Sequence, residues 1–166
     1  MADKSDIYLE LLKEHQEYAR HHEEHREKAT NIILLIAGGL FTASSLKQPD
    51  MLTIPLSFFI VVLGVYGAII SAKHYERSQF HLQRGRALRQ ELDRMIPDLR
   101  LNELKDRADA ETQRNFPTLF PLRLFKMWIG IHVIVALGGL SQIVFVAYKL
   151  SSPSAAAAAI PAEKKP

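Results

Sequence analysis

The chain has 166 residues, with 21 Lys and Arg against 18 Asp and Glu, a formal net charge of +3 and no cysteine. Without cysteine, the chain has no disulfide, no thiolate nucleophile and no Cys-ligated metal or cluster. Its mean hydropathy near zero is typical of a soluble protein. The charges are distributed unevenly, however, because none falls in residues 29–46, 51–72 or 127–148.

These three charge-free runs contain 18, 22 and 22 residues and are rich in Ile, Leu, Val, Phe and Gly. At a helical rise of 1.5 Å per residue they extend about 27 to 33 Å, close to the thickness of a bilayer core. The sequence therefore predicts an all-α integral membrane protein with transmembrane helices at residues 29–46, 54–72 and 127–148. The alternative is a soluble domain with a buried helical hairpin, which would need three runs of membrane length to arise for packing reasons alone.

The basic residues predict how the chain is oriented. Five precede the first run, only Lys47 lies in the first connection, twelve lie in residues 73–126, and three follow the third run. The positive-inside rule then places residues 1–28 and 73–126 in the cytoplasm, and the C-terminal residues 149–166 outside. We expect a multi-pass protein of a bacterial inner membrane. Because charged residues precede the first run, we expect that run to be a retained anchor rather than a cleaved signal.

Prolines predict where the helices end. Pro49 ends the first helix, and Pro55 suits the first turn of the second, so the two spans form a hairpin. The second helix is predicted to continue beyond the membrane until Pro97, with Asp98 capping a further helix to about Gln113.

The segments around the third span are predicted to be irregular. Residues 116–121 contain two prolines and are expected to form an elbow at the membrane interface, leading to Trp128 at the level of the aromatic belt. The tail, residues 149–166, is of low complexity and is expected to be disordered.

Two stripes with helical spacing predict that the cytoplasmic segments pair as an antiparallel stalk resembling a coiled coil. The opposite charges of the two segments favour the pairing, because residues 3–28 carry eight acids and five bases, and residues 73–94 carry six bases and three acids. The expected register joins His22 to His81 and Leu11 to Leu92. The stripes are Leu11, His15, Tyr18, His22, His25 and Ala29 on the first helix, and His74, Ser78, His81, Gly85, Leu88, Leu92 and Met95 on the second.

This stalk would contain most of the histidines. We expect His22, His25, His74 and His81 to form a pH-sensitive joint, because imidazoles gain charge near pH 6. His21 and His25 are four residues apart and could share a metal ion, but the interpretation we favour is hydrogen-bonded or solvated histidines with no metal.

Small residues at four-residue spacing lie in the predicted spans and let membrane helices approach closely. Two adjacent rows on the second span favour more than one neighbour, and we expect a homo-oligomer to provide it. The predicted packing residues are Gly39 and Ala43 in the first span, and Gly64, Gly67, Ala68, Ser71 and Ala72 in the second.

His132 is the one ionisable imidazole inside a predicted span, which makes it a candidate functional residue. Its two interpretations are a role in proton or ion transfer and a neutral imidazole hydrogen-bonded to a neighbouring helix. The second is favoured, because the residue lies only six positions beyond Lys126 and therefore close to the headgroups.

The remaining motifs bear on partners and chemistry. Basic residues in 73–77 and 84–89 are expected to meet anionic lipid headgroups rather than nucleic acid, because the stretch lacks a recognition pattern. No GxSxG, Walker or GxGxxG motif is present, so we expect neither an enzyme nor a cofactor.

A charged first helix is followed by a short membrane hairpin and then by a helix with the sequence Lys-His-Tyr-Glu-Arg-Ser-x-Phe-His-x-x-Arg. In this architecture the chain resembles the SLATT-like two-transmembrane effectors of prokaryotic conflict systems. The resemblance covers residues 9–95 and is architectural; the third span lies outside it. The first hypothesis for the function is an oligomeric effector whose spans assemble through the small-residue rows, whose cytoplasmic helices sense or dock a protein partner, and whose opening permeabilises the membrane. The alternatives are a scaffold or accessory subunit of a membrane complex, and a small transporter using His132.

Overall fold

The computed structural model describes residues 3–46 and 50–152, and over these residues the chain forms helices joined by short connections, without any strand. The helices are α1 (Lys4–Ser45), α2 (Thr53–Met95), the short 3-10 helix η1 (Pro97–Leu99), α3 (Leu101–Asn115) and α4 (Leu124–Ser151). By length and composition α1, α2 and α4 could each cross a membrane. The prediction of an all-α chain with three candidate spans is therefore confirmed.

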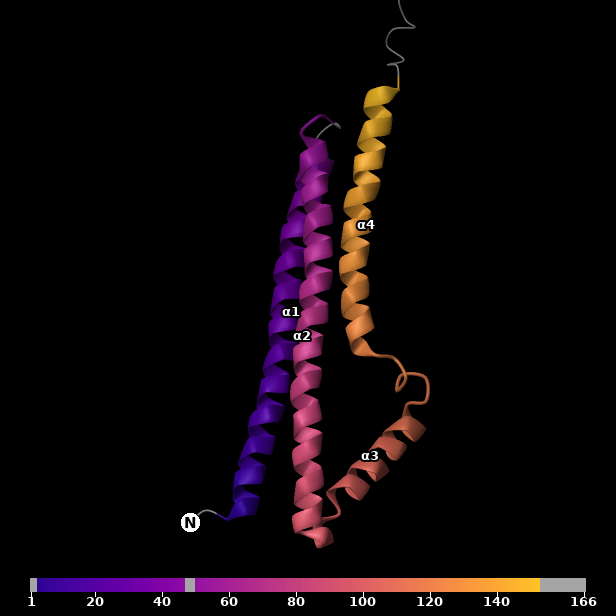
Figure 1. Ribbon diagram of the computed structural model, residues 1–166. Coiled ribbons are helices and arrows are strands. Elements are labelled where there is room, and N and C mark those ends of the chain that lie inside the picture. The colour runs from indigo at the N-terminus through magenta and orange to yellow at the C-terminus, as the bar shows by residue number, and fades with distance from the viewer. Residues whose placement is uncertain (1–2, 47–49, 153–166) are drawn as a thin grey trace, which may run out of the picture.

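The helix α2 is the centre of the molecule. It packs against α1 as a long antiparallel pair and against α4 on another side, whereas α1 and α4 touch each other little (Figure 1). The helix α3 leads away from the end of α2 and back toward the start of α4 (Figure 1). Two neighbours for α2 are thus present within a single chain.

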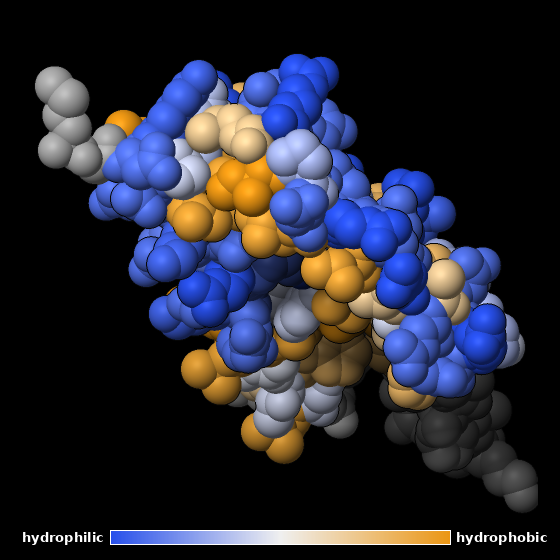
Figure 2. All heavy atoms as spheres, turned by 90° about the horizontal axis from the view of Figure 1, so that it is seen from below, coloured by the Kyte–Doolittle hydropathy of each residue, from blue (hydrophilic) through white to orange (hydrophobic). Residues whose placement is uncertain are grey.

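Both helices of the pair run unbroken through segments of different polarity. We call residues 4–28 and 73–95 the charged half of the pair, and residues 29–45 and 53–72 its apolar half. Seen from the charged end, the molecule is mainly hydrophilic, with hydrophobic atoms between the charged ones (Figure 2). Residues 4–28 and 29–45 of the two predicted segments are therefore parts of one helix, α1.

The observed helix ends follow the prolines that the structure describes. Pro55 lies in the first turn of α2, and α2 ends at Met95, two residues before Pro97. At the other end of the chain, α4 extends to Ser151, so the first residues of the predicted tail are helical. Pro49 and residues 153–166 lie outside the described residues.

The buried residues of α2 recur every seven positions. Most are small, which lets the neighbouring backbones approach; they are Ser57, Gly64, Ser71, Ser78, Gly85 and Leu92. On α1 the same spacing joins Ala19, Arg26 and Ile33. The stripe on α1 is thus turned by one residue from the predicted one, because Leu11 and Tyr18 are exposed.

The register of the charged half differs from the predicted one, although the predicted contact between His22 and His81 is present, because their rings stack with centroids 5.6 Å apart. His15 faces His81 and His22 faces His74, so paired residue numbers sum to 96 instead of 103. The connection between Ser45 and Thr53 is centred nearer the N-terminus than the prediction assumed. Because the shift is a whole heptad, histidines still meet histidines.

The predicted cap of α3 is also wrong. Asp98 lies inside η1, and the carboxylate that caps α3 belongs to Asp93, whose two oxygens accept hydrogen bonds from the backbone N–H groups of Leu101 (2.6 Å) and Asn102 (2.9 Å). Between them the chain reverses at Arg100, which has a φ of 48°. The sharp turn is what brings the end of α2 within reach of the orphan N–H groups of α3.

Candidate functional site

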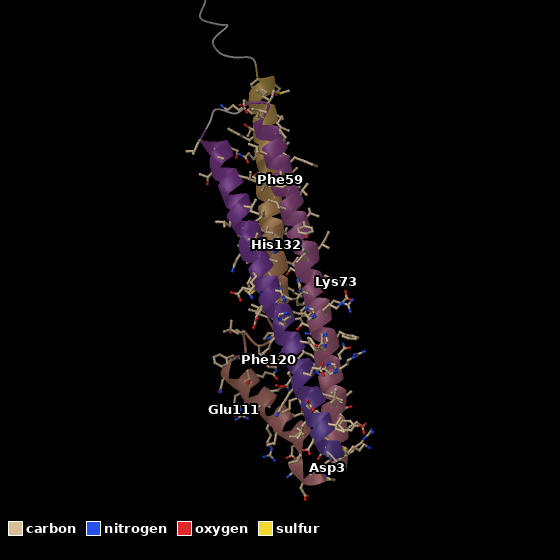
Figure 3. All side chains as sticks on the ribbon, turned by 90° about the vertical axis from the view of Figure 1, so that its left-hand side faces the viewer. Asp3, Phe59, Lys73, Glu111, Phe120 and His132 are labelled. Carbon is tan, nitrogen blue, oxygen red and sulfur yellow. The ribbon has the colours of Figure 1, made fainter. Side chains whose placement is uncertain are left out.

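Four polar side chains are almost completely buried where the charged half meets the apolar half. They are Arg26 and Thr30 of α1, Ser71 of α2 and His132 of α4, each 1 or 2% exposed. Figure 3 shows His132 about midway along the molecule, where the three long helices run side by side. We call these four residues the polar layer. In this layer all three long helices contribute almost completely buried polar side chains.

His132 links α4 to both other helices. Its Nε2 lies 3.1 Å from the Thr30 hydroxyl, within hydrogen-bond distance. Its ring packs directly on Gly67, where a Cβ atom would collide with the imidazole. Gly67 is therefore required for the close approach of α2 and α4 at this level.

Arg26 is the buried charge of the polar layer. Its Nη2 forms an ion pair with Glu23 one turn away on α1, and its guanidinium lies 5.5 Å from the centre of the Trp128 indole. A desolvated cation over an indole face is attracted by the ring quadrupole. Charge and aromatic ring thus hold the start of α4 against α1.

Several polar atoms of this layer have no hydrogen-bond partner among the described residues. They are Arg26 Nε, Ser71 Oγ, Trp128 Nε1 and His132 Nδ1. Ser71 and Trp128 each lie one turn toward the charged half from the contact between Gly67 and His132. The indole and guanidinium nitrogens can only donate, while the serine hydroxyl and the imidazole can donate or accept. These four atoms therefore keep unused hydrogen-bonding capacity in a buried position.

A second group of polar residues, the histidine ladder, follows the seam of the charged half. The Nδ1 atoms of His15 and His81 are 3.2 Å apart, and those of His22 and His74 are 3.4 Å apart. The ring of His22 also stacks on that of His81, with centroids separated by 5.6 Å. The ladder consists of His15, His22, His74 and His81.

Of the predicted pH-sensitive histidines, His25 lies outside this ladder. It is exposed, with its Nε2 2.8 Å from that of His21 on the same helix, although its ring also stacks on His74. His15 takes its place in the seam. Its position on the predicted stripe is the sequence signal that would have identified it.

Burial lowers the pKa of His22, His74 and His81 below the ordinary histidine value. Neighbouring histidines and arginines lower these pKa values further, with Glu23 opposing the effect at His74. A pair of facing Nδ1 atoms needs one donor and one acceptor, so the contact is lost when both rings are protonated. The contacts of the histidine ladder are therefore stable only when its imidazoles are not all protonated.

Among the described residues, no group of three or more His, Asp or Glu side chains has metal-binding geometry. His21 and His25 approach each other without a third ligand.

Two of the predicted packing residues of α2, Gly64 and Gly67, face α4. A Cβ atom on Gly64 would lie 2.5 Å from the backbone nitrogen of Ala136, and Ser71 is buried, whereas Ala68 is half-buried and Ala72 is exposed. From the other side, Gly139 of α4 approaches the backbone of α2. The close packing at Gly64 and Gly139 is thus explained by contacts within one chain.

The predicted packing row of α1 contacts no other described helix. Gly39 and Ala43 are exposed, and a Cβ atom on Gly39 would meet no atom within 4 Å. Their role in contact between chains stays a prediction.

Comparison of the chain with protein-family models, with curated proteins and with solved structures finds no match. The function is therefore argued from the geometry. Three features bear on it: two helices shared by the charged and apolar halves, the polar layer at their junction, and the histidine ladder beyond it.

Proposed function

We propose that this chain is a non-enzymatic integral membrane protein whose cytoplasmic stalk controls its transmembrane helices. The observation that carries the proposal is the continuity of α1 and α2, which run for 42 and 43 residues without a break. A rigid helix transmits a rotation or displacement at one end to the other. A rotation or displacement of α1 or α2 in the charged half is therefore transmitted to the apolar half.

In this proposal the apolar half and α4 span a bacterial inner membrane, with the charged half in the cytoplasm. The excess of basic residues in 73–126 supports this orientation. Exposed apolar side chains of the connection before α4, such as Leu119 and Phe120, suit the headgroup region of the same leaflet. Membrane lipids are thus the first partners of the protein.

The polar layer is the proposed joint between stalk and spans. It connects α4, which has no charged half of its own, to both helices that do. Protonation of the histidine ladder, or a partner bound to the stalk, would move α1 against α2 and disturb the contacts of His132. His132 is then a structural histidine held between helices, in preference to a transport residue.

We propose further that several copies assemble in the membrane and that the assembly perturbs the bilayer, as in the first hypothesis from the sequence. The exposed Gly39 and Ala43 support this step, because small residues on a lipid-facing surface let a second chain approach.

Induced expression in bacteria, with a potential-sensitive dye and cross-linking of intact cells, tests this function. Wild-type protein is expected to form cross-linked oligomers and to depolarise the membrane. Gly39→Leu should reduce both, whereas Gly130→Leu, at another glycine with open space around it, should not. An unchanged membrane potential with the wild-type protein present in the membrane fraction would exclude the membrane-perturbing role.

A second candidate function is that of an accessory subunit in a membrane complex. The observation that favours it is α3, which buries none of its residues and carries charges on all sides. Such a helix is available to a cytoplasmic protein partner. Recovery of one defined partner with wild-type protein in detergent, and its loss on deletion of residues 101–115, would support this function over the first.

A further inference from the structure

We propose that the crevice between α1 and α4 binds one phospholipid, with an acyl chain in its apolar part and the headgroup phosphate at Lys149. The proposal rests on the membrane insertion proposed above. The proposed lipid site lies in the leaflet in which α4 ends, on the side of the membrane opposite to the charged half.

The crevice exists because α1 and α4 each pack on α2 but diverge from each other. Two adjoining cavities of about 390 and 530 Å³ lie along it and share Phe41. Ile60 of α2 lines the first cavity and Thr53 the second. Because these two residues lie seven apart on one face of α2, the cavities form one continuous groove.

The inner part of the groove is apolar. Glycines face it from both sides, since Gly38 and Gly138 line it and a Cβ atom on either would meet nothing within 4 Å. Besides Phe41, its other lining residues are Leu34, Ala37, Thr42, Ile60, Ile134 and Val135. The missing side chains leave a smooth channel of the kind that an acyl chain fills.

The outer part of the groove is still mostly apolar, with Phe41, Phe145 and Val146 in its wall, but it adds polar side chains and a positive charge. Lys149 lines it together with Ser45, Ser141 and Gln142. The Gln142 amide donates to the Ser44 hydroxyl at 2.6 Å, and its oxygen has no partner among the described residues. A phosphate group pairs with the lysine, and the amide and hydroxyl groups can bind the ester and headgroup oxygens or hydroxyls.

The length of the groove fits one leaflet. Ile134 and Lys149 are separated by fifteen residues of α4, or about 22 Å of helix. Half of a bilayer including its headgroups is about 20 to 22 Å thick. Lys149 lies at the outer end of this distance, where the headgroup of a lipid would lie.

A helix of a second copy fits the groove less well. A second helix could insert only its side chains into the narrow inner part, which is lined from both sides by Gly38 and Gly138. An apolar helix would also leave Lys149 without a counter-charge. A phospholipid satisfies both the narrow apolar part and the charged mouth.

Native mass spectrometry of the full-length protein in detergent tests the proposal, with dioleoylphosphatidylglycerol as the titrated lipid. Wild-type protein is expected to retain one lipid at low ratios of lipid to protein. A Cβ atom at Gly138 would meet nothing within 4 Å, so Gly138→Phe adds a ring to the groove and should weaken that binding at least fivefold. The matched control is Gly130→Phe, at an equally open glycine of α4 outside the groove, which should bind as the wild type does.

A second variant tests the headgroup contact. Lys149→Gln should weaken binding of the same lipid while Lys126→Gln, at the other end of α4, should not. Equal losses for Gly138→Phe and Gly130→Phe, or the absence of any saturable lipid adduct, would overturn the proposal. Loss of dimer mass in Gly138→Phe with unchanged lipid binding would show that a second copy occupies the groove instead.

Failure of the lipid-binding proposal can be distinguished from failure of the proposed function. Wild-type protein that fails to remain in membranes after alkaline carbonate extraction contradicts membrane insertion itself. Protein that remains in membranes but binds no lipid at this groove contradicts the present inference alone.

Discussion

The hydroxyl of Thr30 and the Nε2 of His132 lie 3.1 Å apart, although 102 positions separate the two residues in the chain. Both side chains are 1% exposed. A buried hydroxyl and imidazole without each other would leave unsatisfied polar groups, so their contact fixes how α4 sits against α1. The same imidazole packs on Gly67, which makes this residue pair the point where all three long helices are joined.

Gly67→Ala tests this joint. The added methyl group would collide with the His132 ring, and we expect a loss of about 1–3 kcal/mol, as for other overpacked sites. Thermal unfolding in detergent measures it, and Gly130→Ala is the control. The double variant Gly67→Ala with His132→Ala should lose less than the sum of the two single variants. Additive losses would show that the two residues do not interact.

Arg26→Ala tests the contact between the buried cation and Trp128, which is the only tryptophan of the chain. Removal of the guanidinium opens the indole to solvent, so its fluorescence emission should shift to longer wavelength. Arg20→Ala, at an exposed position of the same helix, should leave the spectrum unchanged. Identical spectra for wild type and Arg26→Ala would contradict the stacked arrangement.

The three candidate spans were predictable because apolar composition and length alone identify them. Arg26 was not recognised as a buried residue, since its neighbours Glu23, Glu24 and Glu27 make it look like part of a solvated face. Its aromatic partner, Trp128, lies on a helix about 100 residues further along the chain, and no local sequence pattern predicts such a contact.

The errors in the charged half have similar causes. The register depended on where the hairpin bends, and a shift of one heptad leaves the apolar and histidine faces matched. Asp93 was overlooked as a cap because it lies on the preceding helix and reaches α3 only through the reversal at Arg100. Sequence composition predicts where helices form, whereas the register of the charged half and the cap of α3 depend on the tertiary path of the chain.

The histidine ladder predicts that the protein is less stable at acidic pH. The pKa values of His22, His74 and His81 are lowered on folding, so the unfolded chain binds protons first as the pH falls. The stabilisation is complete above the unfolded value near 6.5 and is lost as the pH falls through the lower, folded values. We expect the melting temperature in detergent to fall between pH 7.5 and pH 5.

Replacement of a ladder pair identifies the source of this pH dependence. The double variant His22→Gln with His74→Gln should flatten the decrease in melting temperature. His21→Gln changes an exposed histidine outside the seam and should preserve the decrease. An equally steep decrease in the double variant would assign the acid sensitivity to other groups.

Asp93→Ala should loosen the start of α3. Loss of two hydrogen bonds at a helix N-terminus costs about 1 kcal/mol, and hydrogen exchange of the amides of Leu101 and Asn102 should accelerate. Asp98→Ala removes the carboxylate that sequence reasoning favoured and should leave that exchange unchanged. A faster exchange with Asp98→Ala alone would contradict the observed cap.

The most direct test of the account is the membrane topology, which can be measured with single cysteines because the chain has none of its own. The positions are Glu10, Asp50, Glu111 and Ser152, each replaced by cysteine in turn and exposed to a membrane-impermeant maleimide in intact spheroplasts. The account predicts labelling at Asp50→Cys and Ser152→Cys, and labelling at Glu10→Cys and Glu111→Cys only after the membrane is permeabilised. Labelling of all four positions in intact spheroplasts, or of Glu111→Cys together with Asp50→Cys, would contradict three spans with a cytoplasmic stalk.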